Sequence, residues 1–298
     1  MELYQLQSFV TVARENHLTR AADFLHISQP AVSAHIKALE EEFGQPLFIR
    51  TPKGMELTPG GVLLCGKAEK ILEQIEELTL FAEDLQETPV GKIRIGLNRD
   101  SDFLRIPALY QHLRSSYPGL EIGLHHAVSG TIVKMIEKNE LDCGFVLGKY
   151  AGDEIRVMVL TELNLRVVGP VGMRKEISAA CQSDLVELPW IGNPPDCPYS
   201  GIMETFFYKH GLTPRTEVVA DQQSAIISMI EAGAGLNFML EEEAIIAEKE
   251  GKLVLWSGRG FPIDLSFVYR GNSRKSLRIQ AITESVSTVW HDVDLLGE

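Results

Sequence analysis

The sequence predicts an α/β protein in which an all-helical amino-terminal part and a long linker helix precede a larger part of alternating strands and helices. Three observations support this fold class. Apolar residues recur at helical spacing through residues 3–43. A second apolar pattern, with a seven-residue repeat, runs through residues 64–85. From residue 91 onward strand-type runs alternate with helix-type segments, as is typical of α/β folds.

Composition limits the class of protein. With 298 residues, 45% hydrophobic and 23% charged, the chain is expected to fold around more than one core. No run approaches the roughly 18 apolar residues of a membrane span, and the amino end lacks the positive charge of a signal peptide, so a cytoplasmic protein is expected. The four cysteines, which form no CxxC pair, predict reduced thiols, with no disulfide framework, metal site or cofactor: Cys65, Cys143, Cys181 and Cys197.

Three short helices are predicted in residues 3–43. The first places four apolar residues on one face: Leu6, Phe9, Val10 and Ala13. Thr19 is expected to cap the second helix, and Ser28 the third, with Pro30 in its first turn, where a missing amide costs little. Because only His26 and Ile27 separate the second and third helices, the two form a tight helix-turn-helix.

The third of these helices has two distinct faces. Its apolar residues share one arc: Val32, Ile36, Leu39 and Phe43. Gln29, Ser33 and Lys37 share a neighbouring arc that also admits Pro30 and Ala34. A small polar face on the second helix of a helix-turn-helix fits a DNA major groove, where Gln29 suits adenine and Ser33 suits a base edge or a phosphate. A solvated helix face carries the same residue types, so this face alone leaves both interpretations open.

The stretch "PLFIRTPKGMELTP" at 46–59 predicts a two-stranded hairpin, or wing, that carries Arg50 and Lys53. Basic side chains on a wing can reach backbone phosphate or a minor groove. The net charge of −13 argues against non-specific affinity for nucleic acid, and acidic residues outnumber basic ones in residues 1–58 as well. Arg20, Lys37 and the two wing residues nevertheless lie apart from the acidic cluster at 40–42, which allows a polarised surface.

A long helix is predicted from Thr58, its cap, to about residue 86. Its apolar residues form a heptad seam: Leu64, Ala68, Ile71, Ile75, Leu78, Ala82 and Leu85. Such a seam favours pairing with a second chain, which would bring two reading helices to the half-sites of a pseudo-palindrome. The alternative is an ordinary amphipathic helix packed on its own chain. The stretch "ETPVG" at 87–91 ends the helix and marks a domain boundary.

The amino-terminal region resembles the winged helix-turn-helix of LysR-type transcriptional regulators. The resemblance covers "LQSFVTVARENHLTRAADFLHISQPAVSAHIKALEEEFGQPLFIRTPKGMELTPGG" and includes the "SQPAVS" helix entry and the "LF.R" wing. Ala34 and His35 stand where family members often carry Arg and Gln. The resemblance implies DNA contacts at Gln29, Pro30, Ser33, Lys37 and Arg50. With neighbouring cap and basic residues, the full predicted DNA-binding set is Thr19, Arg20, Ser28, Gln29, Pro30, Ser33, Lys37, Arg50 and Lys53.

Residues 91–298 read as alternating strands and helices. This alternation predicts a mostly parallel sheet with helices on its faces, and ligands beyond the carboxyl ends of its strands. The segment 162–170 is expected to cross to a second lobe and the strand 263–270 to return. The resemblance implies two lobes shaped like a periplasmic binding protein, with a small-molecule effector between them. The predicted domains are 1–58, 59–88 and 91–298, the last divided into lobe I (91–161 and 266–298) and lobe II (162–265).

The predicted strand ends that would face one cleft are 98–101, 129–131, 147–148, 193–199 and 221–223. The effector-binding residues predicted from them are Asn98, Arg99, Asp100, Ser101, Ser129, Gly130, Thr131, Leu147, Pro198, Tyr199, Asp221 and Gln222. The hydroxyl groups could donate to an anionic oxygen. Arg99 could pair with a carboxylate, although Asp100 and Asp221 would oppose it, so the sequence leaves the charge of the effector open.

Two other classes of protein are alternatives to a regulator: an enzyme and a redox sensor. An enzyme is not expected, because the eight histidines form no HExxH motif and "GAGLN" lacks a P-loop lysine. A redox sensor is the sharper alternative, since peroxide-sensing members of the family use cysteines in the second lobe. Cys197 lies in "PPDCPYSG", but Cys181 is distant in sequence and no nearby Lys or Arg would lower the pKa of Cys197.

The combined prediction is a transcriptional regulator that binds a pseudo-palindromic operator in double-stranded DNA as a homodimer or homotetramer. A small-molecule effector would shift the balance between two arrangements of the assembly. RNA polymerase is the further expected partner, and no membrane is involved.

Overall fold

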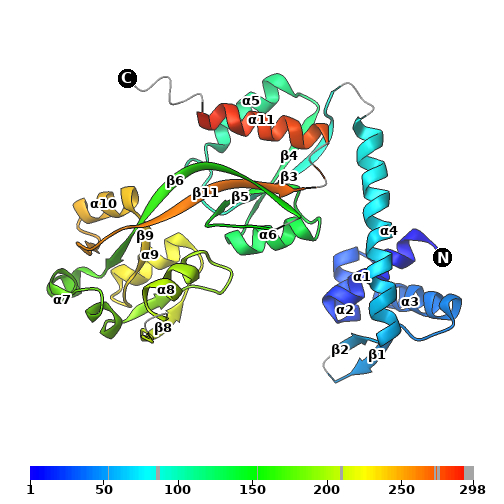
Figure 1. Ribbon diagram of the computed structural model, residues 1–298, viewed down its shortest axis with the longest axis horizontal. Coiled ribbons are helices and arrows are strands. Elements are labelled where there is room, and N and C mark those ends of the chain that lie inside the picture. Colours follow the sequence, from blue (N-terminus) through cyan, green and yellow to red (C-terminus); the bar gives the residue numbers. More distant parts are fainter. Residues whose placement is uncertain are drawn as a thin grey trace. The chain divides into compact units, whose positions relative to one another are not determined.

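The computed structural model divides the chain into two compact units, Met1–Leu85 and Gln86–Glu298 (Figure 1). The structure describes residues 1–52, 54–84, 88–152, 154–208, 211–271, 273 and 276–291. Within these ranges no helix is long and apolar enough to cross a membrane.

The first unit is a helical bundle with a hairpin and a long helix. Its elements are α1 (Leu3–Glu15), α2 (Leu18–Leu25), α3 (Gln29–Phe43), β1 (Phe48–Thr51), β2 (Gly54–Leu57) and α4 (Pro59–Asp84). The predicted apolar arcs of α1 and α3 form its core, in which Phe9, Val32 and Leu39 are fully buried. The rings of Phe9 and Phe48 pack edge to face with centroids 5.5 Å apart, and this contact joins α1 to the wing.

Helix caps set the limits of the helix-turn-helix. The predicted caps at Ser28 and Thr58 are confirmed: Ser28 Oγ accepts from the backbone N–H of Ala31 at 3.3 Å, and Thr58 Oγ1 accepts from that of Gly61 at 2.8 Å. The prediction that Thr19 caps the second helix is wrong. The cap is His17, whose Nδ1 accepts from the Thr19 N–H at 3.2 Å, so the helix begins earlier than predicted and Thr19 lies within its first turn.

A close backbone contact fastens the wing to the turn between α1 and α2. The backbone N–H of Met55 donates to the Asn16 carbonyl at 2.8 Å. Gly54 sits beside the same carbonyl with φ +130°, and a Cβ there would lie 2.1 Å from the Asn16 oxygen. Only glycine allows this approach, so Gly54 fixes where the basic wing lies relative to α1 and α2.

The second unit is organised around one curled sheet. Its strands are β3 (Gly91–Leu97), β4 (Leu120–His126), β5 (Cys143–Leu147), β6 (Ile155–Gly169), β9 (Asn237–Leu240), β10 (Val254–Leu255) and β11 (Phe261–Arg270). The strand order is β10-β6-β11-β5-β3-β4, with β9 paired to β6.

The prediction of a mostly parallel sheet is wrong, because the sheet is mixed. β3 runs parallel to β4 and β5, whereas β11 is antiparallel to β5 and β6, and β9 and β10 are antiparallel to β6. The physical reason lies in the two crossings. β6 carries the chain into lobe II and β11 brings it back, and the two strands pair along their lengths from Leu165 with Phe261 to Ile155 with Arg270.

Helices cover the sheet and complete the two lobes. They are α5 (Ile106–Ser116), α6 (Ser129–Glu137), α7 (Arg174–Ala179), α8 (Tyr199–Phe206), α9 (Gln223–Glu231), α10 (Glu241–Lys249) and α11 (Leu277–His291). Two 3-10 turns, η1 (Val171–Met173) and η2 (Asp184–Glu187), and a small parallel sheet of β7 (Trp190–Gly192) and β8 (Thr216–Val219) lie in lobe II.

The alternation of side chains along β5 explains the two layers of lobe I. Phe145 belongs to the core that includes residues of α5 and α11, and its ring packs on Phe267 of β11 with centroids 5.0 Å apart. Val146, the next residue, packs with Ile132 and Ile136 of α6. Figure 1 accordingly shows α5 and α11 side by side over one face of the sheet and α6 over the other.

A register shift between Leu265 and Ser266 interrupts the β6–β11 pairing. This shift falls where the sequence predicts the boundary between lobes I and II, and a bulge bends the paired strands at such a point. The boundaries at 161 and 265 stay a prediction. Beyond the shift, lobe II is held by packed aromatic rings: Trp190, Phe206, Phe238 and Phe261.

Candidate functional site

The predicted reading face of α3 is accessible in the first unit. Gln29, Pro30 and Lys37 are exposed and Ser33 is half-buried, while the apolar arc of the helix faces the core. Lys37 Nζ lies 3.6 Å from the Glu41 carboxylate, and both side chains are largely exposed. An exposed pair of this kind is weak, so phosphate can compete for the lysine.

The remaining predicted DNA-binding residues differ in whether their side chains are already bonded within the unit. Ser28 uses its oxygen to cap α3. Arg20 Nη2 donates to the carbonyl of Glu15 at 2.5 Å, and this contact holds the exposed guanidinium at the start of α2. Thr19 and Arg50 are exposed, the latter on β1. Lys53 lies outside the described residues.

The predicted seam of α4 divides into two parts. Its amino-terminal part packs on the core of the first unit, where Ala68 is buried and Leu64 is half-buried. Farther along, Ile71, Ile75 and Leu78 are 38%, 36% and 67% exposed, and Ala82 is exposed as well. Leu85 lies outside the described residues. An apolar stripe therefore continues along α4 beyond the part that its own unit covers.

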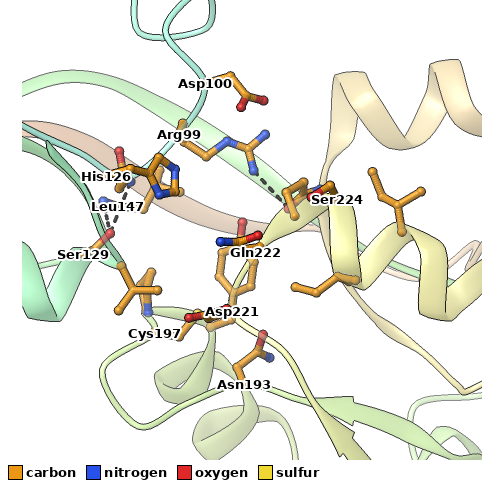
Figure 2. Close-up of a pocket in the computed structure, with 17 residues that line it drawn as sticks. Arg99, Asp100, His126, Ser129, Leu147, Asn193, Cys197, Asp221, Gln222 and Ser224 are labelled. Atoms are coloured by element: carbon orange, nitrogen blue, oxygen red, sulfur yellow. Dashed lines mark hydrogen bonds between the residues drawn. The ribbon is translucent and has the colours of Figure 1, made fainter. Parts of the chain in front are cut away.

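A polar cleft of about 420 Å³ lies between the two lobes of the second unit (Figure 2). Figure 2 shows His126 and Ser129 of lobe I on one side and Asp221 and Gln222 of lobe II on the other. The predicted residues that line the cleft are Asn98, Arg99, Asp100, Ser129, Leu147, Pro198, Tyr199, Asp221 and Gln222. Most of the residues predicted from the strand ends therefore lie together in this cleft.

Three predicted residues do not line this cleft. Ser101 lines a separate, mainly apolar hollow between α5 and β4. Gly130 is in backbone contact with the far lobe: its N–H donates to the Asp196 carbonyl at 3.0 Å, and a Cβ would lie 2.6 Å from that oxygen. Thr131, the third, follows it in α6 and is half-buried.

The cleft also contains residues outside the predicted set: His126, Val128, Asn193, Cys197, Gln223, Ser224, Ile226 and Ile227. Asn193, Cys197 and Gln223 lie within the predicted strand-end ranges but are not among the predicted binding residues. Ser224, Ile226 and Ile227 belong to the first turns of α9. The sequence signal that could have found them is helical spacing, because a helix that starts at a cleft also lines it with its first turns.

Arg99 is the most constrained side chain of the cleft. It follows β3 in lobe I and is only 6% exposed. Its Nη1 donates to Gln223 Oε1 at 3.1 Å, and its Nη2 pairs with the carboxylate of Glu243, so Arg99 links lobe I to α9 and α10 of lobe II. The guanidinium carbon also lies 5.1 Å from the ring centroid of Phe103. Burial opposes its charge, but Tyr199 and Glu243 outweigh burial and raise the pKa of Arg99.

A second link between the lobes borders the cleft. Lys134 Nζ of α6 donates to both carboxylate oxygens of Asp196, at 2.7 and 2.8 Å. Ser129, at the start of the same helix, accepts from the Leu147 N–H at 3.0 Å and lies 3.2 Å from the Asn98 amide. The contacts of Ser129 fix its side chain in the wall of lobe I, so a ligand would meet a preset hydroxyl group there.

The thiol of Cys197 is also part of the cleft wall. Burial raises the pKa of Cys197 to about 11, and the nearby Asp221 charge also raises it. A thiol with such a pKa is almost entirely protonated at neutral pH and is a poor nucleophile. Cys181 is exposed, with its Sγ 2.9 Å from Ser183 Oγ.

A winged helix-turn-helix with an accessible polar reading face, followed by a two-lobed α/β unit with a polar cleft, defines a ligand-responsive DNA-binding protein. Two protein families match the chain and identify the kind of DNA-binding protein. Residues 3–62 match the bacterial regulatory helix-turn-helix protein family of lysR type, and residues 86–290 match the LysR substrate binding domain. The chain belongs to the LysR family: it is a LysR-type transcriptional regulator with an effector-binding domain.

Full-length relatives support this assignment. The chain is 27% identical over 296 residues to the RuBisCO operon transcriptional regulator of Acidithiobacillus ferrooxidans, covering 95% of this chain and 92% of the relative. It is 26% identical over 304 residues to the HTH-type transcriptional regulator CfxR of Cupriavidus necator, covering 100% and 94%. The crystal structure of full-length CbnR complexed with its target DNA shares the fold, with a TM-score of 0.56, 20% identity and coverage of 97% and 100%.

Proposed function

We propose that this regulator reads a pseudo-palindromic operator with α3, as a homodimer or homotetramer, and that a small molecule bound between lobes I and II controls it. The accessible stripe of Gln29, Ser33 and Lys37 carries this proposal, because no residue of the stripe is needed by the core of its own unit. Gln29 and Ser33 are assigned to base edges. Thr19, Arg20, Ser28, Pro30, Lys37, Arg50 and Lys53 are assigned to contacts that position the helix.

The exposed stripe of α4 supports the oligomer. Ile71, Ile75 and Leu78 repeat with heptad spacing, and a second copy of the same helix would cover them. Pairing two chains through α4 gives the assembly twofold symmetry, and an operator with two half-sites matches that symmetry. The CbnR structure, whose target DNA is present, supports DNA as the partner. RNA polymerase and a cytoplasmic location, where such DNA lies, complete the proposal.

The cleft supports control by a small molecule and not catalysis. Its volume of about 420 Å³ suits a small metabolite. Arg99 and Lys134 already join the lobes, so a ligand that altered these contacts would change how the lobes are held together. Among the described residues no cluster of His, Cys, Asp and Glu is arranged to hold a metal ion, and we propose regulation of transcription, not turnover, as the activity.

Selection from a random duplex library tests the proposed function. Purified full-length protein should enrich duplexes with two inverted half-sites separated by about one helical turn of DNA. A variant with Gln29→Ala should enrich a degenerate sequence at one position of each half-site. A library that shows no enrichment with the wild-type protein, or one single unrepeated site, would contradict the proposal.

Redox sensing through Cys197 is the second candidate, and its place in the cleft wall is the observation that favours it. Its raised pKa weighs against it, because peroxide reacts with the thiolate. Mass spectrometry of the protein after mild peroxide treatment discriminates between the two. An unmodified Cys197 would exclude redox sensing. Rapid oxidation of Cys197 together with a change in operator affinity would show that oxidation, and not metabolite binding, is the signal.

A further inference from the structure

A glutamate of the reading helix holds the root of the wing. Glu40 lies in the last turns of α3 and is half-buried. Its Oε1 accepts from the backbone N–H of Leu47 at 2.8 Å and from that of Phe48 at 3.3 Å. Hydrogen bonds from backbone N–H groups to a carboxylate are charge-assisted and therefore strong. The reading helix is thus bonded directly to the first residue of β1 and to the residue before it.

The two neighbouring glutamates make a different kind of contact. Glu41 lies 3.6 Å from Lys37 Nζ, and Glu42 lies 2.7 Å from the amino group of Met1. Both carboxylates are exposed, and exposed ion pairs contribute little. Glu40 differs from them because its carboxylate binds the backbone of another element.

The position of Glu40 along α3 relates this contact to the reading of DNA. Glu40 follows Ser33 by seven residues, which is nearly two turns, so the two side chains leave the helix on the same side. Arg50 follows Phe48 by two residues on β1, a span of about 7 Å. One side of α3 therefore carries a group proposed to read bases and, about 10 Å farther along the helix axis, the anchor of the strand that bears Arg50.

Two further contacts hold the wing, and they come from other elements. Thr58, the cap of α4, donates through Oγ1 to the Pro46 carbonyl at 2.9 Å, and the Asn16 carbonyl accepts from the Met55 N–H. These contacts keep the hairpin folded on its unit. Of the three contacts only that of Glu40 begins on the reading helix. Its loss is therefore expected to shift the root of the wing relative to α3 without unfolding the hairpin.

We propose that Glu40 is a positioning residue for DNA binding, which sets where Arg50 meets the duplex while α3 lies in the major groove. Glu40 acts through the backbone N–H groups of Leu47 and Phe48 and need not touch DNA. This inference rests on the proposed function, in which Arg50 makes a phosphate or minor-groove contact. A wing that is held at a fixed offset from α3 lets both elements bind together, without the cost of ordering the wing on binding.

The test compares Glu40→Ala with Glu40→Gln in the full-length protein. Both variants lose the same negative charge, but only glutamine retains an acceptor oxygen for the two N–H groups. Affinity for the selected operator is measured by fluorescence anisotropy at several salt concentrations. Glu40→Ala should bind about three- to tenfold more weakly than Glu40→Gln, and its salt dependence should indicate about one phosphate contact fewer. Equal affinities of the two variants would overturn the inference.

Removal of Arg50 separates positioning from stability. In the Arg50→Ala background, Glu40→Ala and Glu40→Gln should bind the operator equally, within about twofold, because the wing then has no contact to misplace. The difference in melting temperature between the two Glu40 variants should be the same in both backgrounds, because the bonds to the wing root are lost in each. A merely structural role predicts that the difference in affinity persists without Arg50, or that the salt dependence is unchanged, and either result overturns the inference.

Glu42→Ala is the matched control, because it removes the same charge from the same end of α3. It should bind the operator as Glu40→Gln does, and a loss equal to that of Glu40→Ala would overturn the inference. If Glu40→Ala does not fold, Glu40→Asp is compared with the wild type, because its shorter side chain withdraws the carboxylate at constant charge. Its loss should be about threefold and should vanish without Arg50; no loss overturns the inference.

The outcome for Arg50→Ala alone distinguishes this inference from the proposed function. If Arg50→Ala leaves operator affinity and its salt dependence unchanged, the wing makes no contact for Glu40 to position, and the inference is overturned while operator recognition by α3 stands. If the wild-type protein selects no operator, the proposed function itself fails.

Discussion

The reading face of α3 and the cleft of the second unit use polar side chains in opposite ways. On α3, Gln29 and Lys37 project from a helix that is held by its other face, and their hydrogen-bonding groups are open to a partner. In the cleft, Arg99 and Ser129 are buried and already bonded to other parts of the protein. A reading face can therefore be altered without disturbing the fold, whereas a change in the cleft also changes how the lobes are joined.

The two regions also differ in how their residues are brought together. The reading face lies within one helix, so the 3.6-residue period fixes which side chains share it. The cleft is assembled from segments that are far apart in sequence, between Asn98 and Ile227. Local physics determines the first region, and the topology of a mixed sheet determines the second.

The largest effect is expected from a change that breaks the link between the two reading helices. The double variant Ile71→Glu with Ile75→Glu places charges on the exposed stripe of α4. Burying unpaired charges in a helix pair costs about 3–5 kcal/mol, so the oligomer should dissociate and operator affinity should fall by more than about a hundredfold. Sedimentation velocity measures the oligomeric state.

The control for this variant is Gln74→Glu, which adds a charge at an exposed position of α4 outside the predicted seam. It should leave the oligomer intact. An unchanged sedimentation coefficient in the double variant would refute the pairing of α4, and the stripe would then be an ordinary exposed surface.

A smaller effect is expected from a change on the reading face itself. Gln29→Ala should cost about 1–3 kcal/mol on the selected operator and almost nothing on random duplex, because a base contact is lost only where the right base is present. Fluorescence anisotropy with both duplexes measures the difference. Equal losses of affinity for the two duplexes would make Gln29 a positioning residue. No loss of affinity for either duplex would show that the Gln29 side chain makes no contact with DNA.

Arg50→Ala should sharpen the distinction between reading and positioning. Arg50 is exposed on β1 of the wing and is assigned to a phosphate or minor-groove contact. Its removal should weaken binding to the operator and to random duplex by similar factors. The number of phosphate contacts derived from the salt dependence of binding should fall by about one. Titrations at several salt concentrations give this number. A loss confined to the operator would instead assign Arg50 to base recognition.

The smallest effect concerns the thiol in the cleft wall. Because burial raises the pKa of Cys197 to about 11, the thiolate fraction of Cys197 should be minor at pH 8 and should still be growing at pH 10. The rate of alkylation by iodoacetamide, followed by mass spectrometry, should therefore rise about tenfold per pH unit in this range. A rate that begins to level off near pH 9 would show a thiol of ordinary acidity and would strengthen the redox candidate.

The sequence predicted the amino-terminal unit more completely than the carboxyl-terminal one. The apolar arcs and the caps at Ser28 and Thr58 were predictable because each depends on residues a few positions apart. The Thr19 cap was wrong because the helix begins earlier, at Leu18, with the His17 imidazole as its cap, whereas residue preferences rank hydroxyl groups first.

The second unit exposed the limits of local patterns. Alternating strands and helices predicted its class, but not that β6 and β11 would pair antiparallel along their lengths, since strand direction depends on where the chain returns. Strand ends located most of the cleft. The link from Arg99 to Glu243 could not be predicted, because it joins positions 144 residues apart and no sequence period relates them.

We expect two copies of one reading helix, α3, to recognise two half-sites of the operator. The most direct measurement is the affinity of the wild-type protein for a selected operator, compared with the same duplex in which one half-site is scrambled. If both copies read bases, scrambling one half-site should weaken binding by about two orders of magnitude or more, since each mismatched base pair costs about 1–3 kcal/mol. Equal affinity for the two duplexes would contradict the account.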